Sequence, residues 1–322
     1  MLEVMIDNKD GNVWDISDLV SSFQWKTGRI GKASSAELQF VKGGIYENKS
    51  FRYSNGDILR VKKDGFGVFY GYIFSIDTGK DEQVKITAYD QLRYLMSNDT
   101  YVFKNVTATQ VIQRIAGDFG LKVGALADTG HKIPSMIEDS KKLMDIVCKA
   151  LDLTLIATTR NYVFYDDFGA LRLRNINEMA VEFVVGDGSL LYDYEFKRSI
   201  DSDTHNRVKL VRDNKESGKR DVYIAQDSAN IARWGRLQLY ETVDEKANAA
   251  QINEMLNNLL KLKNREQKSL RLSAIGDIRV RAGCYVPVII QEISINQYFL
   301  IDECTHTIEG ADHTMALELK VI

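Results

Sequence analysis

Proline is scarce in this sequence: Pro134 and Pro287 are the two among 322 residues, against an average usage of about 5%. That scarcity excludes long proline-rich linkers, so we expect tightly joined domains. Long apolar runs are lacking too. The longest, at 153–157 and 286–290, fall far below the roughly 20 residues of a membrane-spanning helix, so no membrane span is expected. The N-terminal residues have neither the basic nor the apolar region of a signal peptide.

Cysteine and net charge are low as well. The three cysteines, Cys148, Cys284 and Cys304, are an odd number at scattered positions, which excludes a disulfide framework. We expect them to be small core residues in a reducing compartment. The net charge is -3, with 42 basic and 45 acidic residues interspersed. Nothing in this pattern predicts a polyphosphate-binding surface, so nucleic acid is not expected as the primary ligand.

What is present is ordinary globular composition, with 44% hydrophobic and 27% charged residues. The length predicts two or three domains. Residues 1–95 are expected to form a first β-barrel-like domain. Ala36, Leu38 and Phe40 alternate with polar residues, which predicts a half-buried strand. Further strands are expected at 57–62, 68–77 and 83–89, and short strands separated by polar turns favour an antiparallel barrel or sandwich.

Residues 96–180 change in pattern and predict a small α/β module. Thr107 and Gln110 have the spacing of a capping box, followed by apolar residues at helical spacing. A second helix is expected from Ser140. Strands are expected at 153–158, 162–166 and 170–174. The two helices with flanking strands resemble a LysM domain.

Strand character returns at 181–225 and 266–322, which we predict to be a second β-barrel-like domain, with a helical insertion at 226–265. The tripeptide Gly-Asp-Ile occurs at 56–58 and again at 276–278. This recurrence favours a divergent duplication, although so short a motif is also common where strands begin. The predicted fold is therefore α+β and β-rich: two related antiparallel β-barrel-like domains, an inserted small α/β module and a helical segment.

Catalytic and metal-binding patterns are weak throughout. Cys304, His306 and His313, joined by Asp302 or Asp312, are the best metal candidate, but a closed zinc site needs four ligands at suitable spacing. A core cysteine and two strand or turn histidines is the favoured interpretation. The Asp-Phe-Gly at 167–169 lacks the other kinase motifs, and no Gly-x-Ser-x-Gly elbow is present. We predict no catalytic residue, no cofactor, no metal and no enzymatic activity.

Aromatic residues gather on the strand expected at 68–77. Phe69, Tyr70 and Tyr72 make it apolar or aromatic on both faces. Core packing is one explanation, since aromatic residues are common in strands. Burial in an assembly is the other, because aromatic residues are enriched in interface cores. On the second interpretation these three residues are candidate interface residues.

Taken in order, several short motifs make the chain similar to the baseplate hub proteins of the PBSX-prophage XkdQ type. The motifs lie at 89–95, 107–121, 206–212, 234–244, 276–283 and 306–317, and the resemblance covers nearly the whole chain. The resemblance implies a structural, trimeric hub of contractile phage tails, contractile injection systems and phage-tail-like bacteriocins. Two related β domains per subunit would give a pseudo-sixfold ring.

The same resemblance implies the partners and the location. A tail tube protein, a spike protein and other baseplate proteins are the expected partners, and a homotrimer is the expected state. The protein would be assembled in the bacterial cytoplasm and become part of a phage or bacteriocin particle. The alternative from another class is a peptidoglycan-binding protein, suggested by the LysM-like module, or a cell-wall hydrolase.

Overall fold

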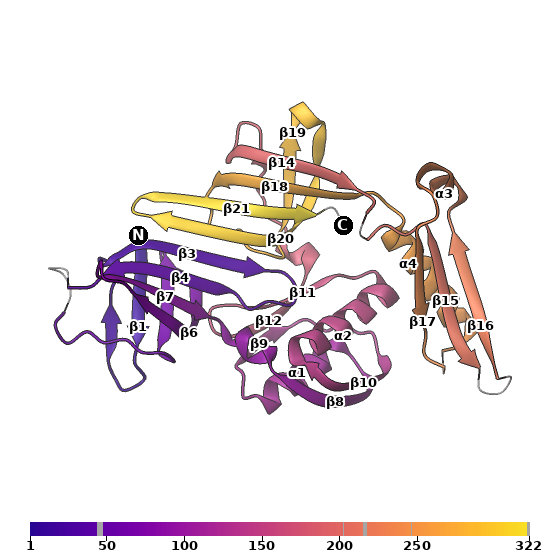
Figure 1. Ribbon diagram of the computed structural model, residues 1–322, viewed down its shortest axis with the longest axis horizontal. Coiled ribbons are helices and arrows are strands. Elements are labelled where there is room, and N and C mark those ends of the chain that lie inside the picture. Colours follow the sequence, from indigo (N-terminus) through magenta and orange to yellow (C-terminus); the bar gives the residue numbers. More distant parts are fainter. Residues whose placement is uncertain (44–47, 202, 215–217, 246, 321–322) are drawn as a thin grey trace.

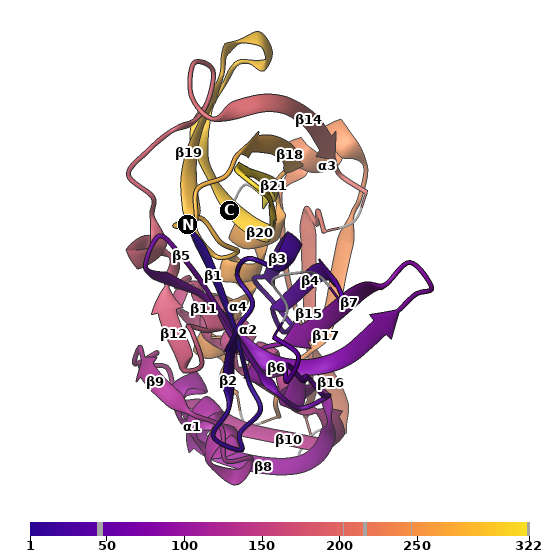
Figure 2. The ribbon, with the colours of Figure 1, turned by 90° about the vertical axis from the view of Figure 1, so that its left-hand side faces the viewer.

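The computed structural model describes residues 1–43, 48–201, 203–214, 218–245 and 247–320. The chain folds into four parts (Figures 1 and 2). Two are β units, one near each end of the sequence. An α/β module follows the first β unit, and an outer module of three strands and two helices interrupts the second. The observed architecture is β-rich α+β, as the sequence predicts.

The first β unit is built from seven strands in the order β3-β4-β7-β6-β5-β1-β2. Alternating side chains of these strands, among them Leu38, Phe40 and Leu59, are buried in one core. The predicted alternation of Ala36, Leu38 and Phe40 with polar residues at 34–41 is confirmed. The strands are β1 (Leu2–Asp7), β2 (Val13–Asp15), β3 (Val20–Gly28), β4 (Ser35–Val41), β5 (Ile58–Lys63), β6 (Phe66–Thr78) and β7 (Gln83–Tyr89).

The second β unit has six strands in the order β14-β18-β21-β20-β19-β13. Its core contains Leu270, Leu272 and Phe299, together with Cys284 and Cys304. These two cysteines are core residues, as expected. The strands are β13 (Val185–Gly186), β14 (Leu191–Ser199), β18 (Gln267–Ile275), β19 (Tyr285–Ile290), β20 (Ile295–Glu309) and β21 (Asp312–Lys320), with a short turn η3 (Gln291–Ile293) between β19 and β20.

Both β units use the same pairing order. Matching strands in chain order, β1 and β3 to β7 correspond to β13, β14 and β18 to β21, and each pair of neighbours in one unit has its counterpart in the other. One pairing differs in direction, because β1 lies antiparallel to β5 whereas β13 lies parallel to β19. A repeated order of six strands supports the duplication far better than a shared tripeptide does.

The glycines that correspond in the two units are Gly56 and Gly283. The Gly56 N–H donates to the Ile73 carbonyl at 2.7 Å, and the Gly283 N–H donates to the Ile301 carbonyl at 2.8 Å. Their φ angles are +91° and +92°, in the region that favours glycine. The predicted match of Gly56 with Gly276 is therefore wrong, because Gly276 instead donates to the His313 carbonyl beside β21.

In the α/β module, two helices pack on short sheets. The capping box of Thr107 and Gln110 is present and starts the first helix. The strand expected at 153–158 is wrong, because the second helix continues through those residues. At 16 residues this is the longest described helix, and none of those described is long and apolar enough to cross a membrane. The elements are η1 (Gln91–Met96), β8 (Asn98–Val106), α1 (Ala108–Asp118), β9 (Val123–Leu126), β10 (Ile133–Lys142), α2 (Leu143–Thr158), β11 (Tyr162–Asp166), β12 (Leu171–Asn175) and η2 (Ile176–Met179).

The outer module projects to the right in Figure 1. Its strands β15 (Arg207–Asn214), β16 (Lys219–Gln226) and β17 (Gln238–Thr242) form a sheet of their own. The expected grouping of 181–225 with the second β unit therefore needs correction, since β15 pairs with β16 and β17 and none of these strands joins the second β unit. The helices α3 (Ser228–Trp234) and α4 (Ala249–Lys263) complete the module, and α4 buries Ile252, Leu256 and Leu259 in its core.

Candidate functional site

The two β units meet along a seam in which β3 of the first pairs antiparallel with β20 of the second. The register runs from Gly28 opposite Glu303 to Phe23 opposite Ile308. Ile308 of β20 packs in the core of the first unit, so the second unit contributes a core residue to the first across the seam. The seam turns two separate sheets into one sheet that passes from unit to unit.

A buried pair of rings fills the centre of the seam. The indole of Trp25 on β3 stacks on the imidazole of His306 on β20, with ring centroids 5.3 Å apart. The His306 Nε2–H donates to the Val280 carbonyl at 2.8 Å, and its Nδ1 accepts from Nε2 of His313 at 3.0 Å. Burial lowers the pKa of His306 to about 4, so its imidazole is neutral at pH 7.

These contacts bear on the candidate metal site of Cys304, His306 and His313, because they occupy the atoms that would bind a metal ion. Both ring nitrogens of His306 are engaged, and burial raises the pKa of the Cys304 thiol. Among the described residues no three His, Cys, Asp or Glu side chains form a group that could hold a metal ion. The cluster is a hydrogen-bonded part of the seam, beside the core cysteine.

Ion pairs border the same seam. Arg29 Nε lies 2.7 Å from an Asp302 carboxylate oxygen, with both side chains largely buried. Lys26 on β3 lies 3.0 Å from Glu303 on β20, and Lys320 also pairs with Asp302. The Arg29 pair is the best shielded from solvent, so it contributes more to fixing the register than exposed pairs do.

In the part of the chain that the structure describes, the strand edges without a partner strand include one on each β unit that carries exposed aromatic residues. The residues of β6 from Ser75 onward pair only with β7. The strand β14 pairs only with β18 and ends the sheet (Figure 1). Phe74 and Tyr192 on these strands are 37% and 63% exposed. An open edge with exposed aromatic residues is a template for pairing with another strand.

The three predicted interface residues divide between core and surface. Phe69 is 2% exposed in the core of the first unit, so the structure corrects its assignment: the side chain is not accessible to a partner. Tyr70 and Tyr72 line a hollow of about 440 Å³ between β6 and the α/β module. Tyr70 meets the ring of Phe168, and Tyr72 that of Tyr94, edge to face. Their part in an interface stays a prediction.

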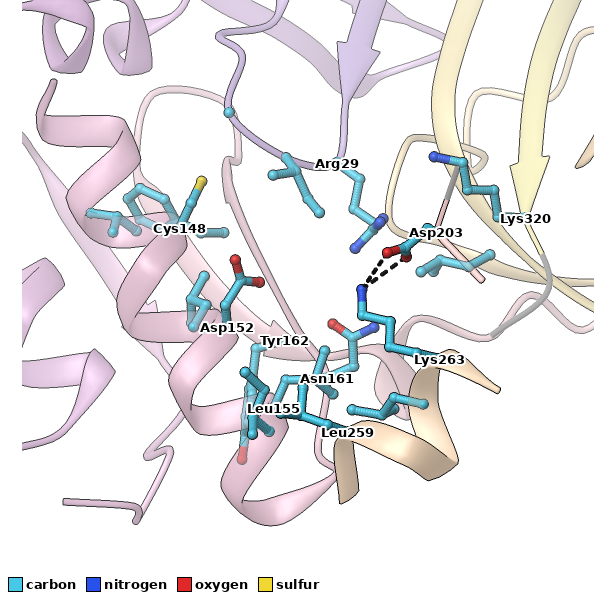
Figure 3. A pocket seen from close by; sticks show the side chains of 18 of the residues that line it. Arg29, Cys148, Asp152, Leu155, Asn161, Tyr162, Asp203, Leu259, Lys263 and Lys320 are labelled. Atoms are coloured by element: carbon cyan, nitrogen blue, oxygen red, sulfur yellow. Dashed lines mark hydrogen bonds and ion pairs between the residues drawn. The ribbon is translucent and has the colours of Figure 1, made fainter. Parts of the chain in front are cut away.

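Another hollow, of about 420 Å³, lies between α2 and α4 and is drawn in Figure 3. Cys148 and Asp152 reach it from α2. Burial raises the pKa of the Cys148 thiol to about 11 and also raises the pKa of Asp152. Lys263 from α4 is paired with Asp203 at 2.7 and 2.9 Å. Because a nucleophilic cysteine needs its thiolate form, this thiol is not activated at neutral pH.

Sequence and fold comparisons agree with this architecture. A family model described as YQBQ-like matches residues 23–320. The "Phage-like element PBSX protein XkdQ" of Bacillus subtilis (strain 168) is 34% identical over 272 residues, which is 84% of this chain and 82% of that protein.

Two solved structures share the fold. One is the 43 kDa tail protein of prophage MuSo2 from Shewanella oneidensis, with a TM-score of 0.71, 16% identity and 98% of both chains covered. The other is the E. coli c3393 protein, a type VI secretion component described as similar to the T4 tail proteins gp27 and gp5. It has a TM-score of 0.58 and 9% identity, and the match covers 99% of this chain and 76% of that one.

Proposed function

The chain belongs to the YQBQ-like family, and from that premise we propose that it is a structural baseplate protein of a phage-type tail. The XkdQ relative is a protein of a phage-like element, and the tail protein of prophage MuSo2 has the same fold along almost the whole chain. The proposed role is mechanical, and no catalytic step is assigned to it. The protein would be assembled in the bacterial cytoplasm and carried in the particle.

Within the baseplate we propose that it is the hub, a ring of three copies between the tail tube and the spike. The observation that carries this proposal is the repeated strand order of the two β units. Three chains with two related units each present six similar positions around an axis while keeping threefold symmetry. Such a ring can contact a sixfold tube on one face and a threefold spike on the other.

The seam within the chain supports this arrangement. In a ring of alternating units, every unit needs the same kind of contact with the next, and β3 with β20 provides one such contact in each chain. The strand pairing, the packing of Ile308 into the first core and the Arg29–Asp302 pair favour a fixed angle between the two units. A fixed angle between units is what a closed ring requires.

The test is co-purification of the tagged chain with the tube and spike proteins of the same phage-type element, combined with light scattering of the chain alone. We expect a mass of three chains and a stable complex with each neighbour. A single-chain mass together with failure to bind either neighbour would overturn the hub. Sedimentation with purified peptidoglycan and a muropeptide-release assay form the comparison arm, where binding or release by the chain would contradict a purely structural role.

A further inference from the structure

Corresponding residues of β6 and β20 are fixed by a bulge that the two strands share. Against β7, the pairing of β6 skips one residue between Ile73 and Ser75. Against β21, the pairing of β20 skips one residue between Ile301 and Glu303. A bulge marks a single position in a strand, so Ile73 corresponds to Ile301. Counting on from there, Asp77 corresponds to Thr305.

The strands β3 and β14 are aligned in the same way. Against β4, the pairing of β3 skips one residue between Val20 and Ser22. Against β18, the pairing of β14 skips one residue between Leu191 and Asp193. Counting on from these bulges, Lys26 of β3 corresponds to Lys197 of β14, and Trp25 corresponds to Phe196.

The seam inside the chain joins the second half of β20 to β3, with Thr305 opposite Lys26. The counterparts of these two segments are the end of β6 and the strand β14, and each of them has an edge without a partner strand among the described residues. The described part of one chain therefore forms this strand pairing once, between β20 and β3. The two strands that could form the equivalent pairing, β6 and β14, each have an open edge there. Since the open edges lie on different units, a neighbouring copy is needed to bring them together.

Burial at corresponding positions shows what the open edges lack. Trp25 is 4% exposed in the seam, whereas its counterpart Phe196 is only partly buried. Cys304 is fully buried in the seam, whereas its counterpart Ile76 on β6 is partly buried. Phe196 and Ile76 are each packed against the core of their own unit. A strand that pairs with β6 or with β14 would cover these side chains further, as the pairing of β20 with β3 covers Trp25 and Cys304.

From this correspondence we infer that copies of the chain join by antiparallel pairing of residues 75–80, the end of β6 and the two residues after it, in one copy with β14 in the next. The register copies the internal seam, so Asp77 lies opposite Lys197, two exposed side chains of opposite charge that suit a cross-strand pair. The contact is head to tail, which closes into a ring when the rotation permits. This inference rests on the proposed ring and names the strands that close it.

Paired cysteines test the register. Directly opposed residues of antiparallel strands have Cα atoms about 4.5–5.5 Å apart, within the range of about 4.4–6.8 Å that a disulfide bridges. In a Cys148→Ser background, the double variant Asp77→Cys/Lys197→Cys is oxidised and run on a non-reducing denaturing gel. We expect covalent species of two and three copies, with the ladder ending at three because the last bond closes the ring.

Three controls accompany that gel. Lys26→Cys/Thr305→Cys bridges the internal seam and should oxidise within single chains. Asp77→Cys/Asp193→Cys displaces one partner by four residues, about 13 Å along β14, and should give no covalent oligomer. A mixture of the two single variants, Asp77→Cys and Lys197→Cys, should give covalent pairs and nothing larger, because each copy then carries one half of the bridge.

The outcomes separate this inference from the proposed function. If light scattering shows three chains and the internal control oxidises, but Asp77→Cys/Lys197→Cys stays single, the ring stands and the β6–β14 pairing is overturned. Equal cross-linking by the displaced pair also overturns the register. Single chains that bind neither tube nor spike protein refute the hub itself, and the inference falls with it.

Discussion

Lowering the pH should weaken the seam between the two β units through His306. Burial lowers its pKa from an ordinary value of 6.5 to about 4. The nearby His313 acts in the same direction, whereas the Val280 carbonyl and Asp277 act against it. The unfolded chain therefore takes up a proton near pH 6.5, whereas the folded chain resists it until about pH 4. Stability from this group is complete above pH 6.5 and is lost as the pH falls to about 4.

The expected loss is about 3 kcal/mol, because each unit of pKa shift corresponds to about 1.4 kcal/mol. Urea unfolding at pH 7 and pH 4 measures it in the wild type and in His306→Gln, which does not titrate but keeps an N–H for the Val280 carbonyl. From pH 7 to pH 4, the unfolding free energy of the wild type should fall by about 3 kcal/mol relative to that of His306→Gln. Asp90, whose buried carboxyl has its pKa raised to about 7, titrates with the opposite sign in both proteins and cancels.

A matched variant tests whether the effect belongs to the seam. His131→Gln removes a histidine of the α/β module, away from β3 and β20. Between pH 7 and pH 4, the stability of His131→Gln should change by nearly the same amount as that of the wild type, whereas the stability of His306→Gln should change by a different amount. Parallel curves for the wild type and His306→Gln between pH 7 and pH 4 would refute the idea that burial keeps this imidazole neutral.

Three further predictions concern local features. Gly56→Ala should cost about 1–2 kcal/mol for its positive φ. Gly283→Ala should cost more, since its Cβ would also lie 2.6 Å from Val163; equal losses in urea unfolding would contradict the packing argument. Thr107→Ala should cost about 1 kcal/mol by removing the capping box of α1, and an unchanged unfolding midpoint would contradict it. Cys148 should react slowly with a thiol reagent at pH 8, because burial raises its pKa to about 11; modification as fast as that of a free thiol would disprove this.

The sequence predicts well what depends on local pattern. The alternation at 34–41 and the capping box of Thr107 each require only neighbouring residues, and both are present in the structure. The duplication was also expected, but from the wrong residues. Gly276 and Asp277 form a turn in which the Val280 N–H donates to the Asp277 carbonyl. The glycine that matches Gly56 is fixed by a hydrogen bond to a distant strand, which a tripeptide cannot show.

Long-range packing explains the other differences. Residues 153–158 are rich in β-branched and apolar side chains, yet they continue α2, where the Ile156 carbonyl accepts from Asn258 of α4 at 2.9 Å. Tertiary contacts override such weak propensities. The strands β15 and β16 resemble those of the second β unit in sequence character, and only their pairing in a separate sheet, β15 with both β16 and β17, sets them apart. The open edges of β6 and β14 could not be recognised before their counterparts in the seam were known.

The most direct test of the ring is a single-particle reconstruction of the purified protein by electron cryomicroscopy. The proposed arrangement predicts three chains and six β units around one axis, with β3–β20 seams alternating with β6–β14 seams. A twofold dimer that pairs like edges, β6 with β6 or β14 with β14, would contradict it. So would a ring in which both of these edges face solvent.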